Sequence, residues 1–180
     1  MADSTSLPAV GLKDTQTATP AGQVISPMID GVSVRSLTTL LDARGEICEL
    51  VSMAWPEAAG VSSPHVYLAS VRTGIVKGWI VHRLQTDRLS LVTGTLHVVL
   101  YDGRPDSPTF GTVREVFGGD RARMLVVIPP GVWHAVRNVG ETEGLYVNAP
   151  DLPYDHENPD KCRLPIDTDR IPYSFDEPRR

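Results

Sequence analysis

The sequence predicts a single all-β domain, a barrel or a sandwich, and three observations support this fold class. The chain has 180 residues, which is about the length of one domain. Its apolar residues come in many short runs, and Gly, Pro and Asp residues separate those runs at regular intervals. This pattern is typical of antiparallel strands joined by tight turns, and a domain of this size can bury a sizeable core without disulfide or metal staples.

The expected strands follow one another from the first third of the chain to residue 147. The apolar runs lie at residues 32–34, 47–51, 66–68, 89–92, 96–101, 124–128 and 145–147. The turn signals between them lie at residues 42–45, 73–74, 93–94, 102–103, 118–119 and 129–131. In this central region, short helical turns are expected only at residues 36–43 and 56–59.

The two ends of the chain differ from this region. Residues 1–27 are rich in Ser, Thr, Ala, Pro and Gln and show no period, which predicts a flexible arm. The domain then comprises residues 28–180. From about residue 149, many Pro and Asp residues favour an irregular tail with one or two short helical turns that wraps the domain.

Composition argues against several classes of partner. The net charge is −5 and the basic residues form no stripe, so we expect no nucleic-acid partner. No apolar run has the length of a membrane span and no secretory signal is visible, so we expect no membrane partner. Cys48 and Cys162 lack metal-binding spacing and are expected to be reduced thiols in a cytoplasmic protein.

Residues 129–138 fit the spacing P-x-G-x-x-H-x-x-x-N, which resembles the second sequence motif of the cupin barrels. The Pro-Pro-Gly sequence makes a tight turn into a strand, because Gly131 can take a backbone angle closed to other residues. The strand would then direct His134 into the mouth of the barrel. The resemblance implies a cupin, which is a jelly-roll barrel of antiparallel strands.

Residues 74–94 resemble the first cupin motif, G-x5-H-x-H-x(3,4)-E-x6-G, with two substitutions. Ile80 stands where the first His would be, and Asp87 replaces Glu. Because side chains alternate along a strand, we expect Ile80 and His82 to share the inward face. Three possible ligands of a divalent metal, with one position left open, are His82, Asp87 and His134. We expect a site without metal or other cofactor, and the metal site is the alternative.

Five local patterns are spread over most of the expected domain, at residues 42–49 (D-x-R-G-x-x-x-E), 74–78 (G-I-V-K-G), 107–111 (S-P-T-F-G), 128–134 (I-P-P-G-x-x-H) and 145–146 (L-Y). They resemble segments of the dTDP-4-dehydrorhamnose 3,5-epimerases, in which the second segment reads G-V-L-R-G. The chain therefore resembles a divergent branch of this family. The resemblance implies a cupin fold and an isomerase that acts next to the ketone of a dTDP-sugar.

The resemblance also implies roles for individual residues. Arg44 and Glu49 would contact the nucleotide, and Tyr146 would be the general acid. Ile80 occupies the place of the family's catalytic His. We expect His82, on the same strand face, to act as the base in its stead.

Other side chains are expected to complete the site. In the family an Asp of the C-terminal tail orients the base, and Asp167 is the nearest match here, with Asp87 as a second candidate. Proton removal leaves an enolate that needs a nearby donor or cation. The candidates for that role are His134, Lys77 and Arg88. Trp133 is a candidate wall for a sugar or base ring.

These residues predict an enzyme that acts on a dTDP-4-keto-6-deoxy sugar by proton abstraction at C3 or C5. Two alternatives stay open. One is a metal-dependent cupin, an oxygenase or a lyase on a small metabolite, and the other is a non-catalytic sugar-nucleotide-binding protein that lost its base at Ile80. Similar cupins form domain-swapped dimers, so we expect a homodimer in which Arg44 and Glu49 serve the neighbouring subunit's pocket.

Overall fold

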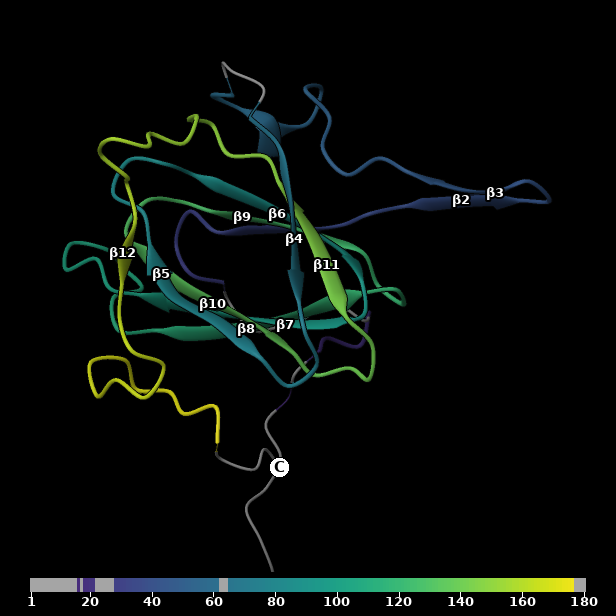
Figure 1. The fold of residues 1–180 in the computed structure, drawn as a ribbon. Coiled ribbons are helices and arrows are strands. Elements are labelled where there is room, and N and C mark those ends of the chain that lie inside the picture. The colour runs from purple at the N-terminus through teal and green to yellow at the C-terminus, as the bar shows by residue number, and fades with distance from the viewer. Residues whose placement is uncertain (1–15, 17, 22–27, 62–64, 177–180) are drawn as a thin grey trace, which may run out of the picture.

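The computed structural model describes residues 16, 18–21, 28–61 and 65–176, and most of the predicted arm over residues 1–27 lies outside this part of the chain. The described residues form two sheets that face one another, with a hairpin that projects to one side (Figure 1). No helix among these residues is long and apolar enough to cross a membrane.

Both sheets have five strands, and their strand pairs are antiparallel. In spatial order, the first sheet contains β1 (Ser33–Ser36), β9 (Met124–Ile128), β6 (Asp87–Thr93), β11 (Gly144–Asn148) and β4 (Tyr67–Val71). The second contains β12 (Cys162–Arg163), β5 (Val76–Val81), β10 (Val132–Asn138), β7 (Thr95–Asp102) and β8 (Val113–Gly119). The predicted all-β fold is confirmed.

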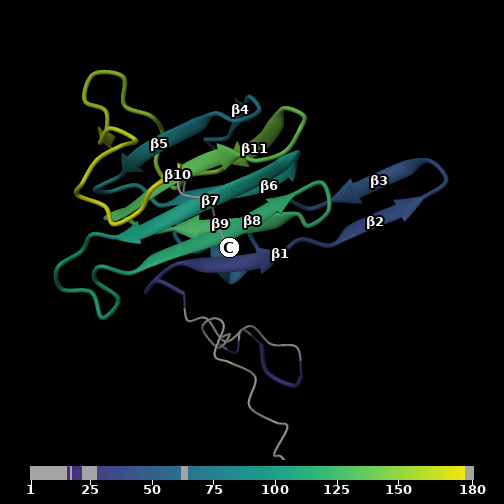
Figure 2. The ribbon, with the colours of Figure 1, turned by 90° about the horizontal axis from the view of Figure 1, so that it is seen from below.

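The projecting hairpin consists of β2 (Thr39–Asp42) and β3 (Gly45–Cys48), and it extends away from both sheets (Figure 2). The helical turn expected at residues 36–43 is therefore wrong. The tight turn from Asp42 to Gly45 lets the two arms pair, with Leu40 opposite Ile47, and this pairing satisfies the backbone in place of a helix. The second expected helical turn is present as the 3-10 turn η1 (Pro56–Ala58).

The main core lies between the sheets, because alternate side chains of each strand point inward. Its fully buried members include Leu91 of β6, Leu100 of β7 and Ile128 of β9. The C-terminal tail, described to residue 176, contains no helix and instead adds β12 to the edge of the second sheet.

A second apolar cluster lies on the outer face of the second sheet, under the C-terminal tail. Trp79 of β5 is fully buried there, and Phe175 of the tail packs on it with 5.6 Å between ring centroids. The two faces of this sheet thus pack against different parts of the chain. The inner face contributes to the main core and the site, and the outer face anchors the tail.

Candidate active site

The polar site lies at one end of the barrel, where β5 ends and where β6 and β10 begin. Along β5, Trp79 belongs to the outer cluster, so its neighbour Ile80 points toward the interior and lines a cavity there. His82 follows the strand and lines the same cavity. The shared inward face of Ile80 and His82 is as the alternation of strand side chains predicted.

Three buried polar side chains converge in this cavity, His82, Asp87 and His134. Oδ2 of Asp87 lies 3.4 Å from Nε2 of His82 and 3.2 Å from Nε2 of His134. The two imidazole rings are nearly parallel, with 21° between their planes and 6.1 Å between their centroids. Asp87 is only 3% exposed, and a carboxylate so buried needs donors or charges around it.

Main-chain carbonyls and Asp87 set the tautomers of the two imidazoles. Nδ1 of His82 donates to the carbonyl of Asp160, so Nδ1 carries the hydrogen in the neutral ring and Nε2 keeps a free lone pair. His134 donates from Nε2 to Oδ2 of Asp87, while its Nδ1 lies 3.3 Å from the carbonyl of Val132. The cluster therefore combines one imidazole that can accept a proton with one that holds the carboxylate.

The second oxygen of Asp87 is held by two amide side chains. Oδ1 accepts from Nε2 of Gln85 at 2.6 Å and from Nδ2 of Asn148 at 2.7 Å. Burial alone would raise the pKa of Asp87, but His134, His82 and Asn148 together bring this pKa well below its usual value. Asp87 is therefore ionised at neutral pH and fixed in orientation.

His82 has the opposite electrostatic balance. Burial lowers the pKa of its imidazole, and the attraction of Asp87 offsets this effect only in part. The ring is therefore neutral at pH 7. A neutral imidazole with a free Nε2 is the form that accepts a proton from a substrate.

Both sheets contribute to the cavity, since β11 and β6 belong to the first and β5 and β10 to the second. Its lining residues are Tyr67, Lys77, Ile80, His82, Asp87, Leu89, His134, Val136, Tyr146, Asn148 and Lys161. Burial raises the pKa of the Tyr146 phenol, which is therefore neutral at physiological pH. The predicted residues His82, His134, Tyr146, Lys77 and Asp87 are thus brought together.

Two other predicted site residues lie on the opposite face of their strands. Nε of Arg88 donates to the carbonyl of Glu57 at 2.6 Å, so this side chain holds the η1 turn against the first sheet. Trp133 packs in the outer cluster under the C-terminal tail. Neither lines the cavity, because their neighbours Asp87 and His134 point inward and strand side chains alternate.

Asp167 is also not brought to the cavity, since it lies exposed on the C-terminal tail. Asp160 occupies the place beside His82 instead. Its carbonyl accepts from His82, and its carboxylate lies 3.9 Å from Nδ1 of the same ring. The sequence reasoning missed Asp160 and its neighbour Lys161. Neither stands in a recognisable motif, because their positions depend on how the tail returns to the barrel.

Arg44 and Glu49 lie on or beside the projecting hairpin, away from the cavity of their own chain. The guanidinium of Arg44 is 90% exposed and pairs with Asp42 at 2.6 Å, and Glu49 is exposed. A separate pocket of about 520 Å³ adjoins the cavity at His82. It extends along Leu84 and Tyr154 and offers space for a larger part of a ligand whose reacting end reaches His82.

The donor set of the cluster also suits a divalent metal. The ligand atoms of His82, Asp87 and His134 all lie within 4.8 Å of one another. Two imidazole nitrogens and one carboxylate oxygen form a set that zinc and non-haem iron use. The carbonyl partners of both Nδ1 atoms are the outer contacts that metal-bound histidines usually have. The geometry therefore fits a metal as well as a shared proton.

Sequence comparisons place this chain among sugar-nucleotide enzymes. The profile of the dTDP-4-dehydrorhamnose 3,5-epimerase family matches residues 27–167. The probable low-salt glycan biosynthesis epimerase Agl13 of Haloferax volcanii is 34% identical over 142 residues, which cover 78% of this chain and 90% of that protein. The spore coat polysaccharide biosynthesis protein SpsL of Bacillus subtilis is 35% identical over 150 residues, which cover 82% and 97% respectively.

Solved structures agree with these relatives. A dTDP sugar isomerase from Desulfovibrio desulfuricans is 31% identical, has a TM-score of 0.75, and the match covers 81% of this chain and 91% of that one. This likeness and the matching profile confirm the predicted cupin jelly-roll fold and the predicted class of enzyme, a sugar-nucleotide isomerase. By its sequence and its fold, the chain belongs to the dTDP-4-dehydrorhamnose 3,5-epimerase family.

Proposed function

We propose that this protein inverts a carbon next to the ketone of a dTDP-4-keto-6-deoxy sugar. Family membership supports the class of substrate. The observation that carries the reaction is the position of His82 and Tyr146. Both line one cavity, yet His82 follows β5 of the second sheet and Tyr146 belongs to β11 of the first. A sugar bound between the sheets would meet them on opposite faces, as inversion requires.

His82 is the base in this proposal. Its neutral ring, with the hydrogen on Nδ1 held by the Asp160 carbonyl, offers Nε2 to the C3 or C5 proton. Asp87 then stabilises the imidazolium that forms, at 3.4 Å from Nε2. His134 holds Asp87 from the other side, which keeps this carboxylate beside the base.

Tyr146 is the acid that returns a proton to the opposite face. Its phenol is neutral at physiological pH, so it can donate. Tyr67 lines the same wall, and its hydroxyl accepts a hydrogen bond from Asn148 at 2.8 Å. The enolate between the two proton transfers needs a donor, and Lys77 and His134 lie in the same cavity.

Hydrogen exchange tests this function directly. The protein is incubated with dTDP-4-keto-6-deoxyglucose in D2O, and the C3 and C5 protons are followed by NMR. We expect loss of one or both signals together with signals of an epimer. In Tyr146→Phe, exchange should continue while inversion slows by about 10²-fold, because the base still works and the acid is lost. A wild-type protein that binds the substrate without exchange would contradict the proposal.

The metal-binding geometry of the cluster supports a second candidate function, a metal-dependent cupin reaction. His82, Asp87 and His134 would hold the ion, which would act as a Lewis acid toward a bound oxygen. Elemental analysis of the purified protein decides between the two. One equivalent of a transition metal, with activity that is lost on chelation and restored by that metal, would favour this candidate over the proton-transfer reaction.

The proposal also includes a homodimer. Three large apolar side chains of the hairpin, Leu40, Leu41 and Ile47, are 65%, 78% and 66% exposed in the single chain, and a second subunit would cover them. In such a dimer Arg44 and Glu49 would contact the nucleotide in the neighbouring pocket. Light scattering should give twice the mass of 19.6 kDa. The free thiols of Cys48 and Cys162 support a reducing compartment such as the cytoplasm.

A further inference from the structure

The segment 160–163 of the C-terminal tail is fastened to the mouth of the barrel on both sides of Lys161. Before it, the carboxylate of Asp160 accepts from three successive main-chain amides, at 2.9 to 3.0 Å. These amides belong to Arg83, Leu84 and Gln85. After it, β12 pairs with the end of β5. Lys161 is therefore fixed in position, which is a precondition for a role at the reacting atoms.

The side chain of Lys161 lines the cavity that contains His82, Asp87 and Tyr146. It is half-buried, and burial is the largest influence on its pKa, which lies below the usual value. The neighbouring Arg163 lowers this pKa further, while Asp87 raises it. An ammonium that has lost part of its water interacts more strongly with a nearby anion than one in bulk solvent does.

The charges of the cavity explain what such a cation could do. Asp87 is ionised, and proton removal next to a ketone places a second negative charge on the ketone oxygen. Two like charges in one small cavity repel each other, so the enolate needs a cation. The lysines that line the cavity are Lys77 and Lys161. Lys77 is exposed at the rim of β5, whereas Lys161 is the partly desolvated one.

We propose that Lys161 is a catalytic residue that donates a hydrogen bond to the ketone oxygen of the substrate and stabilises the enolate. The assignment rests on the proposed epimerase function and adds a group from the C-terminal tail to it. When the proton is abstracted, the C–H electron pair moves into the ring and forms the C=C bond of the enolate. The C=O π pair moves to the oxygen that Lys161 contacts, and the proton goes to Nε2 of His82.

The test uses the full-length protein, the D2O exchange assay and the variant Lys161→Met, which keeps an unbranched apolar side chain and removes the ammonium group. We expect kcat and the exchange rate to fall by about 10²-fold, with KM changed less than threefold, because the enolate is stabilised only after substrate binding. Lys161→Arg should retain an intermediate rate. Arg170→Met is the control, since Arg170 is exposed on the same tail and lies outside the cavity, and its rate should stay within twofold of wild type.

Rescue by small amines separates a chemical role from a structural one. Adding ethylammonium to Lys161→Ala should restore part of the exchange rate and saturate with amine concentration, whereas a misfolded variant would not respond. A Lys161→Met protein that keeps more than a third of the wild-type rate would overturn the role of Lys161 and leave the epimerase function standing. Absence of exchange in the wild-type protein would overturn both.

Discussion

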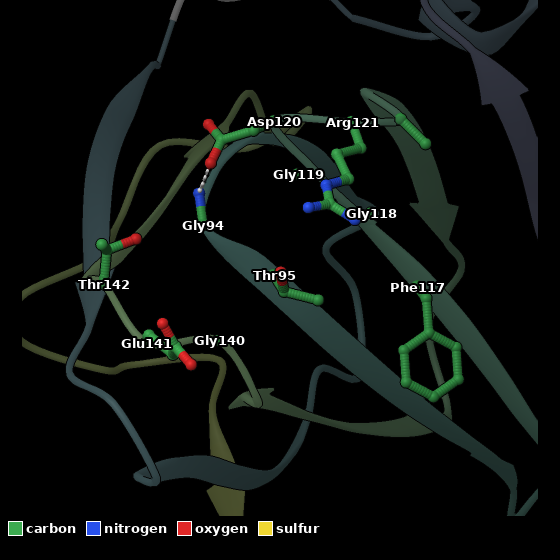
Figure 3. A pocket seen from close by; sticks show the side chains of 11 residues that line it. Gly94, Thr95, Phe117, Gly118, Gly119, Asp120, Arg121, Gly140, Glu141 and Thr142 are labelled. Carbon is green, nitrogen blue, oxygen red and sulfur yellow. Dashed lines mark hydrogen bonds between the residues drawn. The ribbon is translucent and has the colours of Figure 1, made fainter.

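The two ends of the barrel each have a hollow, and they differ in what surrounds it. The pocket in Figure 3, of about 590 Å³, is lined by Gly94, Gly119 and Gly140 among others. Its charged residues Asp120, Arg121 and Glu141 are exposed. The pocket beside His82, of about 520 Å³, is somewhat smaller. Only at that end, within the described residues, do the buried side chains of two histidines and a carboxylate meet.

This difference shows that size is a poor guide to the site in this molecule. Exposed charges keep their water and interact weakly, whereas buried charges must be matched by specific partners. At the glycine-rich end, the carboxylate of Asp120 only accepts from the main-chain amide of Gly94 at 3.0 Å, which closes a turn (Figure 3). At the other end, each polar group is oriented by a second one, as catalysis requires.

The largest expected effect comes from removing the base at the polar end. His82→Gln should lower kcat/KM for the proposed substrate by about 10³-fold, because general base catalysis is lost while the fold is kept. Steady-state kinetics measure kcat/KM, and a thermal melt checks that the fold is kept. His156→Gln is the matched control, since His156 is exposed on the tail and should be replaceable within twofold. Equal kcat/KM values for His82→Gln and His156→Gln would contradict the assignment of catalysis to the polar end.

A stability experiment tests a second buried carboxylate at the polar end, Asp102, where β7 ends. It is fully buried, accepts from Nε of Arg104 at 2.8 Å, and accepts from the hydroxyls of Ser107 and Thr109 at 2.6 Å. Asp102→Asn should lower the free energy of unfolding at pH 7 by about 3 kcal/mol, because the Arg104 charge loses its partner. Urea unfolding curves measure this change.

The same variant has a predicted pH dependence. Burial would raise the pKa of Asp102, but hydrogen bonds from Arg104, Ser107 and Thr109 lower it well below the usual value. A lowered folded-state pKa contributes stability above the unfolded-state pKa of about 3.9, and this contribution is lost as the pH falls below it. The difference between wild type and Asp102→Asn should therefore shrink below about pH 4. A constant difference down to pH 2 would contradict this account.

Substitutions at the glycine-rich end should lower the stability of the protein and leave its activity unchanged. Gly94 has a φ of 72°, and a Cβ there would lie 2.7 Å from Cα of Gly144. Gly94→Ala should cost about 2 kcal/mol, as strain and as a backbone clash, while kcat of the folded protein stays within twofold. Gly74→Ala is the control, because its φ is 75° and its Cβ would meet nothing within 4 Å. If both variants lose equal stability, the clash contributes nothing.

The smallest effect is expected from the charges of the hollow in Figure 3. Arg121→Ser should change neither the exchange rate by more than twofold nor the free energy of unfolding by more than about 0.5 kcal/mol, because Arg121 is exposed. The same two assays measure it. A loss of activity above tenfold would show that the glycine-rich end contributes to the reaction after all.

Local rules were sufficient for the fold and for the inward-pointing part of the site. Period-two alternation placed Ile80 beside His82, and the two spaced motifs brought His82, Asp87 and His134 to one end of the barrel. The same rule, applied to neighbours, would have excluded Arg88 and Trp133, since each is adjacent in sequence to an inward-pointing residue. The helical turn expected at 36–43 gave way to a hairpin, since pairing across Asp42 and Gly45 satisfies both arms. The strand expected at 47–51 overlaps β3, which begins earlier and ends at Cys48.

By itself, the sequence determined the jelly-roll class, the turns and the two histidines of the cluster, because these depend on spacing along a strand. Only the tertiary structure decided which residues of the C-terminal tail reach His82. The tail returns to the barrel at residues 160–163, so Asp160 and Lys161 enter the site and Asp167 stays exposed. No local pattern sets that contact, because three amides of one loop and the edge of β5 bind the tail from across the fold.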